Sequence, residues 1–268
     1  MEKYKNEEYL KKEIMGQSRH LFIYGYDNDY RSDFLKSLEI AYPVTIDSNK
    51  PVALYFNSLG LPKIESSIKD KDTYLIHSIS REYLYFTVAF KILERSVEID
   101  KSTLDRRLKR LISLINIINS NRNNEYKEIE TVADLLKEIN NTKKFYLENY
   151  INYMKGLTKS ISVNDISIPF MQLEMFVNEY KKAMGINSYI GIIFDKKEPL
   201  DISSTHAINN LINSRINKDI SVKVAIEPNN WDSYRTTNGS FIDAIHDYGT
   251  VELDDSYKKH IKILKRQL

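Results

Sequence analysis

The segment Leu21-Phe-Ile-Tyr-Gly25-Tyr-Asp-Asn-Asp-Tyr30-Arg31-Ser32 joins an apolar, β-prone run to the start of a plausible helix. Its glycine and its serine occupy the first and last positions of the phosphate-binding frame G-x4-G-K-[ST]. In such a loop, backbone N–H groups at a strand-to-helix turn hold phosphates, helped by the helix N-terminus. The segment therefore predicts a strand, a turn with a phosphate-binding frame, and a helix.

Two positions of that frame depart from the motif. Tyr30 stands where the second glycine belongs, and glycine there permits a left-handed backbone. Arg31 stands where the lysine belongs, and it is interpreted either as a phosphate ligand or as a surface cation of the helix. If nucleotide binds, the expected phosphate ligands are Gly25 and the amides from residue 26, through Asp29, to Ser32. Ser32 also carries the hydroxyl expected to bind magnesium.

Length and composition describe a chain that can bury a sizeable core. The 268 residues are 28% charged and 42% apolar, as in folded globular domains. The net charge of +2 does not by itself indicate nucleic acid. No apolar run approaches the ~20 residues that span a bilayer, and no signal-peptide segment is present. We therefore expect a cytoplasmic protein without a membrane partner.

Cysteine and histidine usage bears on metal and redox chemistry. The chain has no cysteine, which excludes disulfides and thiolate metal sites and suits a reducing compartment. Its five histidines are scattered, and no two stand at i, i+3 or i, i+4. The sequence therefore argues against a zinc site.

Strand and helix signals alternate at both ends of the chain. Strands are predicted at His20–Tyr24, Pro43–Asp47, Val52–Phe56, Tyr189–Phe194, Ser221–Ile226 and Thr250–Leu253. Helices are predicted at 3–14, 32–41, 73–96, 168–184 and 203–215, with Gly185 as a left-handed cap of the fourth. This alternation favours a mostly parallel sheet that is covered on both faces.

The middle of the chain has a different pattern. An apolar stripe with spacings of four and three is formed by Leu104, Leu108, Leu111, Ile115 and Ile118. Residues 101–158 are predicted to form a helical hairpin or small bundle, and the stripe is either its core or a dimer seam. The expected organisation is a first core part at 1–96, a helical insertion at 97–185, and a second core part at 186–268.

A second strand signal ends in an acidic residue, as a magnesium site beside a phosphate loop requires. This segment is Ile190-Gly-Ile-Ile-Phe-Asp195, so Ser32 and Asp195 are the predicted magnesium ligands. Many ATPases place a water-activating carboxylate next, where this chain has Lys196, and Glu198 is the candidate catalytic base. Lys196 is also interpreted as an ion-pair partner of Asp195 or Glu198, which would remove the need for a metal.

Together these segments resemble the bacterial origin-recognition-complex-like branch of the AAA+/STAND ATPases. There, an acidic strand end is followed by a helix, a strand, a proline, a tryptophan and an arginine. In this chain the strand is Val222–Ile226, and the three residues that follow it are Pro228, Trp231 and Arg235. The resemblance covers residues 15–60 and 186–255. It implies a three-layer α/β P-loop NTPase core with a mostly parallel sheet and a helical insertion.

The resemblance also implies a function. We expect a degenerate ATPase-like subunit with a regulatory or scaffolding role in a bacterial assembly for anti-phage defence or DNA maintenance. The implied cofactor is ATP or ADP with Mg²⁺, bound weakly or not at all, and the implied partner is another protein or a second copy. Arg235 is either an arginine finger or a plain loop arginine. The first alternative is an active ATPase that uses Glu198 or Glu227 as base.

The second alternative is a nucleic-acid-binding module that uses basic helices. The predicted final helix has a basic face formed by Lys258, Lys259, Lys262, Lys265 and Arg266. A second basic group interleaves with the leucine stripe and consists of Lys101, Arg106, Arg107, Lys109 and Arg110. Both groups are also interpreted as solvated helix faces, because acidic residues lie nearby and the overall charge is near balance.

Overall fold

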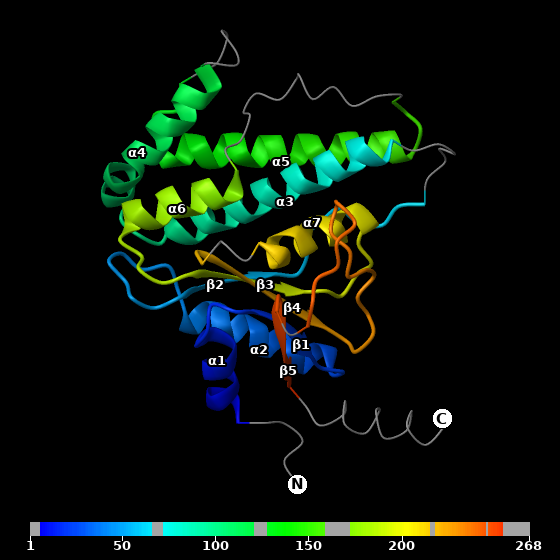
Figure 1. The fold of residues 1–268 in the computed structure, drawn as a ribbon. Coiled ribbons are helices and arrows are strands. Elements are labelled where there is room, and N and C mark those ends of the chain that lie inside the picture. Colours follow the sequence, from blue (N-terminus) through cyan, green and yellow to red (C-terminus); the bar gives the residue numbers. More distant parts are fainter. Residues whose placement is uncertain are drawn as a thin grey trace, which may run out of the picture.

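A computed structural model describes residues 6–65, 72–120, 128–158, 172–214, 218–244 and 246–253. Its centre is a sheet of five parallel strands in the spatial order β2-β3-β4-β1-β5 (Figure 1). The strands are β1 (His20–Tyr24), β2 (Val52–Phe56), β3 (Ile190–Asp195), β4 (Ile220–Ile226) and β5 (Tyr248–Glu252). The predicted α/β fold with a parallel sheet is confirmed, and it is consistent with a P-loop NTPase core.

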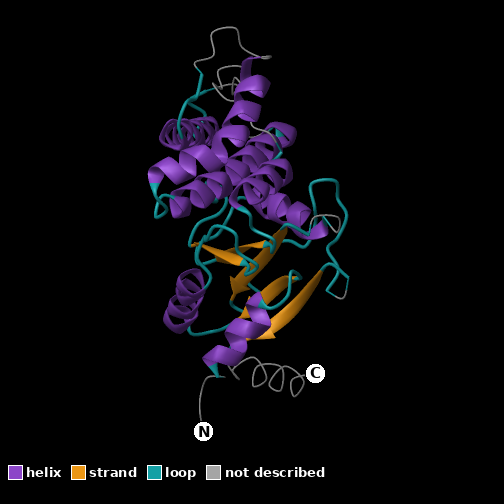
Figure 2. Ribbon diagram, turned by 90° about the vertical axis from the view of Figure 1, so that its left-hand side faces the viewer, coloured by secondary structure: helices purple, strands orange, loops and turns teal. Residues whose placement is uncertain are grey.

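Helices cover both faces of this sheet. They are α1 (Glu7–Met15), α2 (Asn28–Ala41), α3 (Thr73–Ser96), α4 (Lys101–Ser120), α5 (Val132–Met154), α6 (Leu173–Met184) and α7 (Ile202–Asn213). Helices α1 and α2 lie on one face, α7 and α3 lie on the other, and α4, α5 and α6 extend that second layer (Figures 1 and 2). Within the described residues, no helix is long and apolar enough to cross a membrane. The basic residues from Lys258 to Arg266 lie outside the described residues.

Alternate side chains of the same strands fill two separate cores. Phe22 and Ile192 face the helical layer of α3 to α7, whereas Ile23 and Ile193 face α1 and α2. A strand that is buried on both faces needs apolar residues at every position, which is why these segments read as continuous apolar runs. The leucine stripe of α4 belongs to the larger core, because Leu104, Leu108, Leu111 and Ile115 are buried within the single chain.

The segment predicted as a strand at Pro43–Asp47 is not one. The outer edge of β2 is already used, since Ala53 N–H donates to Tyr42 O (2.8 Å) and Tyr55 N–H donates to a Glu39 carboxylate oxygen (3.0 Å). An edge strand whose N–H groups are satisfied in this way offers little to a further strand. Residue 47 instead adopts a positive φ of 53°.

Helix α6 ends at Gly185, as the sequence predicts. Gly185 has φ 69° and ψ 30°, and the next N–H, that of Ile186, donates to Lys181 O (2.9 Å). A side chain at this position would meet the neighbouring loop, because an added Cβ would overlap Asp47 Oδ1 and lie 3.1 Å from Asp47 Cα. The glycine is therefore required both by its backbone conformation and by the close approach of the loop.

Gly185→Ala is expected to lower the free energy of unfolding by more than Gly239→Ala does. Gly239 has a similar positive φ, 85°, but an added Cβ there has no atom within 4 Å. The control, Gly239→Ala, should lower the free energy of unfolding by about 1–2 kcal/mol through backbone strain alone. Gly185→Ala adds the crowding against Asp47 to that strain. Urea denaturation of both variants measures the difference, and equal losses would show that the loop does not press on Gly185.

Candidate functional site

The turn between β1 and α2 is shorter than the phosphate-binding frame requires. Helix α2 begins at Asn28, four residues before the predicted start. Asp27 caps it: the Asp27 carboxylate accepts the Tyr30 N–H (3.1 Å), and the Asp27 carbonyl accepts the Arg31 N–H (2.9 Å). Only Gly25, Tyr26 and Asp27 separate the strand from the helix, so helical hydrogen bonds use amides that a phosphate would need.

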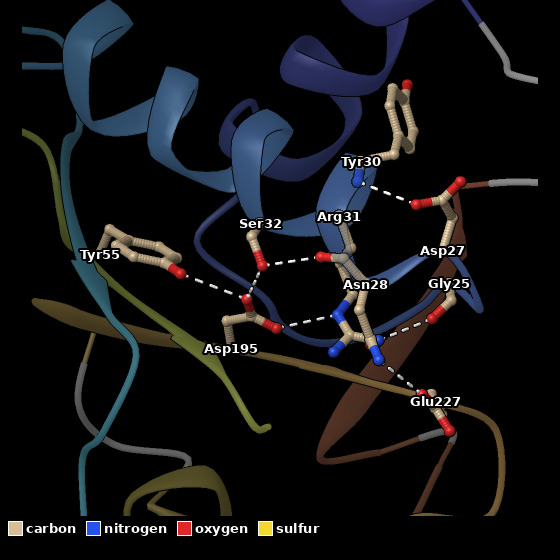
Figure 3. A network of polar contacts seen from close by, with 9 residues as sticks. All are labelled: Gly25, Asp27, Asn28, Tyr30, Arg31, Ser32, Tyr55, Asp195 and Glu227. Atoms are coloured by element: carbon tan, nitrogen blue, oxygen red, sulfur yellow. Dashed lines mark hydrogen bonds and ion pairs between the residues drawn. The ribbon is translucent and has the colours of Figure 1, made fainter. Parts of the chain in front are cut away.

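Arg31 turns away from solvent toward the end of β3 (Figure 3). Its side chain is 1% exposed, and its Nε donates to Asp195 Oδ1 at 2.8 Å. Its Nη1 donates to the carbonyl of Gly25 at 2.7 Å. Because β4 lies between β1 and β3, this contact ties two strand ends together across a third strand. The arginine is thus neither a surface cation nor directed toward a ligand.

Asp195 is fully buried, and donors from the chain engage both of its carboxylate oxygens. Besides the arginine on Oδ1, Oδ2 lies 2.5 Å from Ser32 Oγ and accepts the Tyr55 hydroxyl at 3.2 Å. Burial, and then the charge of Asp195, raise the pKa of Tyr55 to about 12, so the phenol keeps the proton that it donates. Ser32 Oγ also lies 2.8 Å from the carbonyl of Asn28. Ser32 and Asp195, the predicted magnesium ligands, therefore contact each other directly, and the cation bound to Asp195 is the Arg31 guanidinium.

The charges at the N-terminus of α2 are negative. Asp27 caps the helix, Asp29 lies in its first turn, and Glu227 accepts a hydrogen bond from the Asn28 side chain at 3.0 Å. A helix N-terminus attracts phosphate through its dipole and free amides, and carboxylates here already occupy that position. A magnesium ion would also meet the arginine cation on Asp195. The arrangement therefore does not fit a magnesium nucleotide.

The remaining predicted catalytic residues stay apart from this network. Glu198 is exposed. Lys196 is buried, donates to Asn230 O (2.8 Å) and forms an ion pair with Asp232 (3.0 Å). The interpretation of Lys196 as the ion-pair partner of Asp195 or Glu198 is therefore wrong. Arg235 is exposed, and its guanidinium carbon lies 4.9 Å from the ring centre of Phe241.

The basic group of α4 is partly neutralised. Arg107 makes two hydrogen bonds to Asp47 (2.7 and 3.2 Å), and Arg110 lies 3.6 Å from Glu179. Lys101, Arg106 and Lys109 are exposed. Within the described ranges, no group of three or more histidine, aspartate or glutamate side chains is arranged to hold a metal ion.

Tyr55 is the site residue that sequence reasoning missed. It lies opposite Ile193 in the β2–β3 register, and Asp195 follows two residues after Ile193. Side chains two apart on a strand share a face, so Tyr55 and Asp195 project to the same side of the sheet. The strand order, which the sequence does not state, is the information that was needed.

Asp195→Asn is expected to destabilise the chain by about 3–5 kcal/mol, because it leaves the buried Arg31 cation without its partner. Urea denaturation with Glu198→Gln as the control measures this. The control carboxylate is exposed and should change stability by less than about 0.5 kcal/mol. A magnesium site that stands open would behave differently: neutralising its carboxylate would leave stability unchanged or raise it, and that result would contradict the closed network.

Comparison with known proteins places the chain in a family. The family model described as ORC-CDC6-like matches residues 48–268, which is more than half of the chain and includes Asp195 but not Gly25–Ser32. No curated protein and no solved structure gave a match. The order of strands and helices agrees with the architecture of a P-loop NTPase core. The chain therefore belongs to the ORC-CDC6-like family of AAA+ proteins.

Proposed function

We propose that this chain is a non-hydrolysing member of its family, with a regulatory or scaffolding role in a bacterial multi-protein assembly. The observation that carries the proposal is the buried pair of Arg31 and Asp195, which uses the groups that a magnesium nucleotide would need. The residues of the predicted nucleotide site instead hold the ends of β1 and β3 together. Family resemblance suggests anti-phage defence or DNA maintenance as the process.

The free energy needed to separate Arg31 from Asp195 supports weak or absent nucleotide binding. A ligand at this position has to separate the arginine from the carboxylate, and breaking a buried pair costs about 3–5 kcal/mol. Each 1.4 kcal/mol is a factor of ten in affinity, so a cost of about 4 kcal/mol weakens binding about a thousandfold. The ligand would also displace the Asp27 cap from the Tyr30 amide. Both costs are absent from an open phosphate loop.

A scaffolding role is supported by the second layer of the fold. The core of the sheet continues into helices α3 to α6 without a break, so the helical layer is held firmly on the sheet. That layer carries exposed apolar side chains suited to a protein partner, including Ile117 (57% exposed) and Leu157 (71% exposed). The partner is either another protein or a second copy of this chain.

Calorimetric titration with ATP and with ADP, each with and without Mg²⁺, is expected to give no binding heat at micromolar protein. Arg31→Ala and the exposed-arginine control Arg106→Ala should give the same flat result. Steady-state assays should likewise detect no phosphate release. Micromolar binding that Arg31→Ala weakens and Arg106→Ala leaves unchanged would instead place a nucleotide in this loop. Turnover abolished by Glu198→Gln would favour the active ATPase.

A further inference from the structure

Two histidines that are 129 residues apart in sequence meet where α3 packs against α7. His77 Nε2 of α3 lies 3.4 Å from His206 Nδ1 of α7. The other ring nitrogen of His206, Nε2, lies 3.3 Å from Ser233 Oγ. Both histidines are half-buried, so neither residue is sealed from solvent. The scattered sequence positions had argued against such a pair.

The separation of these two nitrogens suits two ligands of one metal ion. Zinc–nitrogen bonds are about 2.0–2.1 Å long, and two ligands of a tetrahedral ion with such bonds stand about 3.3–3.4 Å apart. An N–H···N hydrogen bond alone usually brings the two nitrogens closer, to about 3.0 Å. This separation is therefore compatible with two ligands of one metal ion.

The protonation state of the pair also suits a metal. Burial lowers the pKa of both His77 and His206 below the ordinary value, and in His206 the neighbouring His77 adds to this. A lowered pKa favours the neutral imidazole, which is the form that binds metals. Ser233 can accept the proton of His206 Nε2, which leaves a lone pair on Nδ1 facing His77.

Charged groups around the pair act in both directions. Asp201 is close enough to raise the pKa of each histidine, and Arg235 lowers that of His206. The Asp201 carboxylate is held in place by the Tyr150 hydroxyl (3.2 Å) and the Ser203 amide (2.8 Å). It would favour a cation at the pair without serving as a ligand, whereas the exposed Arg235 would disfavour one.

We propose that His77 and His206 bind a divalent transition metal ion of the zinc class, with water in the remaining coordination positions. Imidazole nitrogen suits Zn²⁺, Co²⁺ and Cu²⁺, and not Mg²⁺. With two protein ligands the affinity is below that of a four-ligand structural zinc site. The bound ion would join α3 to α7 within the helical layer. This site is separate from the one around Asp195 and does not depend on the proposed function.

Thermal unfolding of the full chain with ZnCl₂ or MgCl₂ tests the site. Zn²⁺ at 100 times its dissociation constant should stabilise the protein through mass action, and Mg²⁺ should have no effect. His77→Gln and His206→Gln should each weaken zinc affinity at least about tenfold. The control His246→Gln, whose side chain is exposed outside the pair, should leave the affinity unchanged.

A second readout does not depend on the variants folding. Adding Co²⁺ to the unmodified chain should shift and intensify the visible d–d absorption bands relative to free Co²⁺, and Zn²⁺ should reverse that change by displacing the ion. The proposal is wrong if neither ion binds to the unmodified chain. It is also wrong if folded His77→Gln and His206→Gln bind zinc as well as the control does, because the ion would then be held elsewhere.

Discussion

The ion pair between the Arg31 guanidinium and the Asp195 carboxylate is the contact on which the C-terminal edge of the sheet depends. It joins the start of α2 to the end of β3 across β4, and it fills the space where parallel strands of this kind usually receive a ligand. Both charges are almost completely buried, so neither tolerates the loss of the other. The surrounding donors from Ser32 and Tyr55 complete the solvation of the carboxylate that water would otherwise provide.

The local backbone follows from the same constraint. With Asp27 as the cap, α2 starts early enough for Arg31 to lie one turn inside the helix, from where its side chain reaches both Asp195 and the carbonyl of Gly25. An open loop of the usual length would present Arg31 to a phosphate instead. The shortened turn, the early helix and the closed ion pair are therefore parts of one arrangement, and family membership alone does not require it.

Much of the fold could be predicted because burial leaves a direct mark on sequence. The strand at Ile190–Asp195 is apolar at nearly every position, since both of its faces are covered, and Gly185 marks a helix end that needs a positive φ. The start of α2 could not be placed, because Asn28, Asp29 and Tyr30 are residues that loops and first helical turns both accept. Pro43–Asp47 looked like a strand because nothing local reveals that the edge of β2 is already satisfied.

Several members of the candidate site stand out in the sequence, whereas Tyr55 and the arrangement of the site do not. Gly25 and Asp195 stand at strand ends and Ser32 lies one turn inside α2, and motif spacing finds all three. The direction of Arg31 depends on a carboxylate 164 residues away, and the meeting of His77 with His206 depends on how α3 packs on α7. Such contacts follow from tertiary packing, which a spacing rule within one segment does not contain.

The coupling free energy between Arg31 and Asp195 tests the account most directly. A double-mutant cycle of Arg31→Met and Asp195→Asn, followed by urea denaturation, isolates this term. We expect a coupling of at least about 2 kcal/mol, unchanged by saturating Mg²⁺ and ADP. Additive losses, or a coupling that disappears when Mg²⁺ and ADP are added, would contradict the account, because the two side chains would then serve a nucleotide rather than each other.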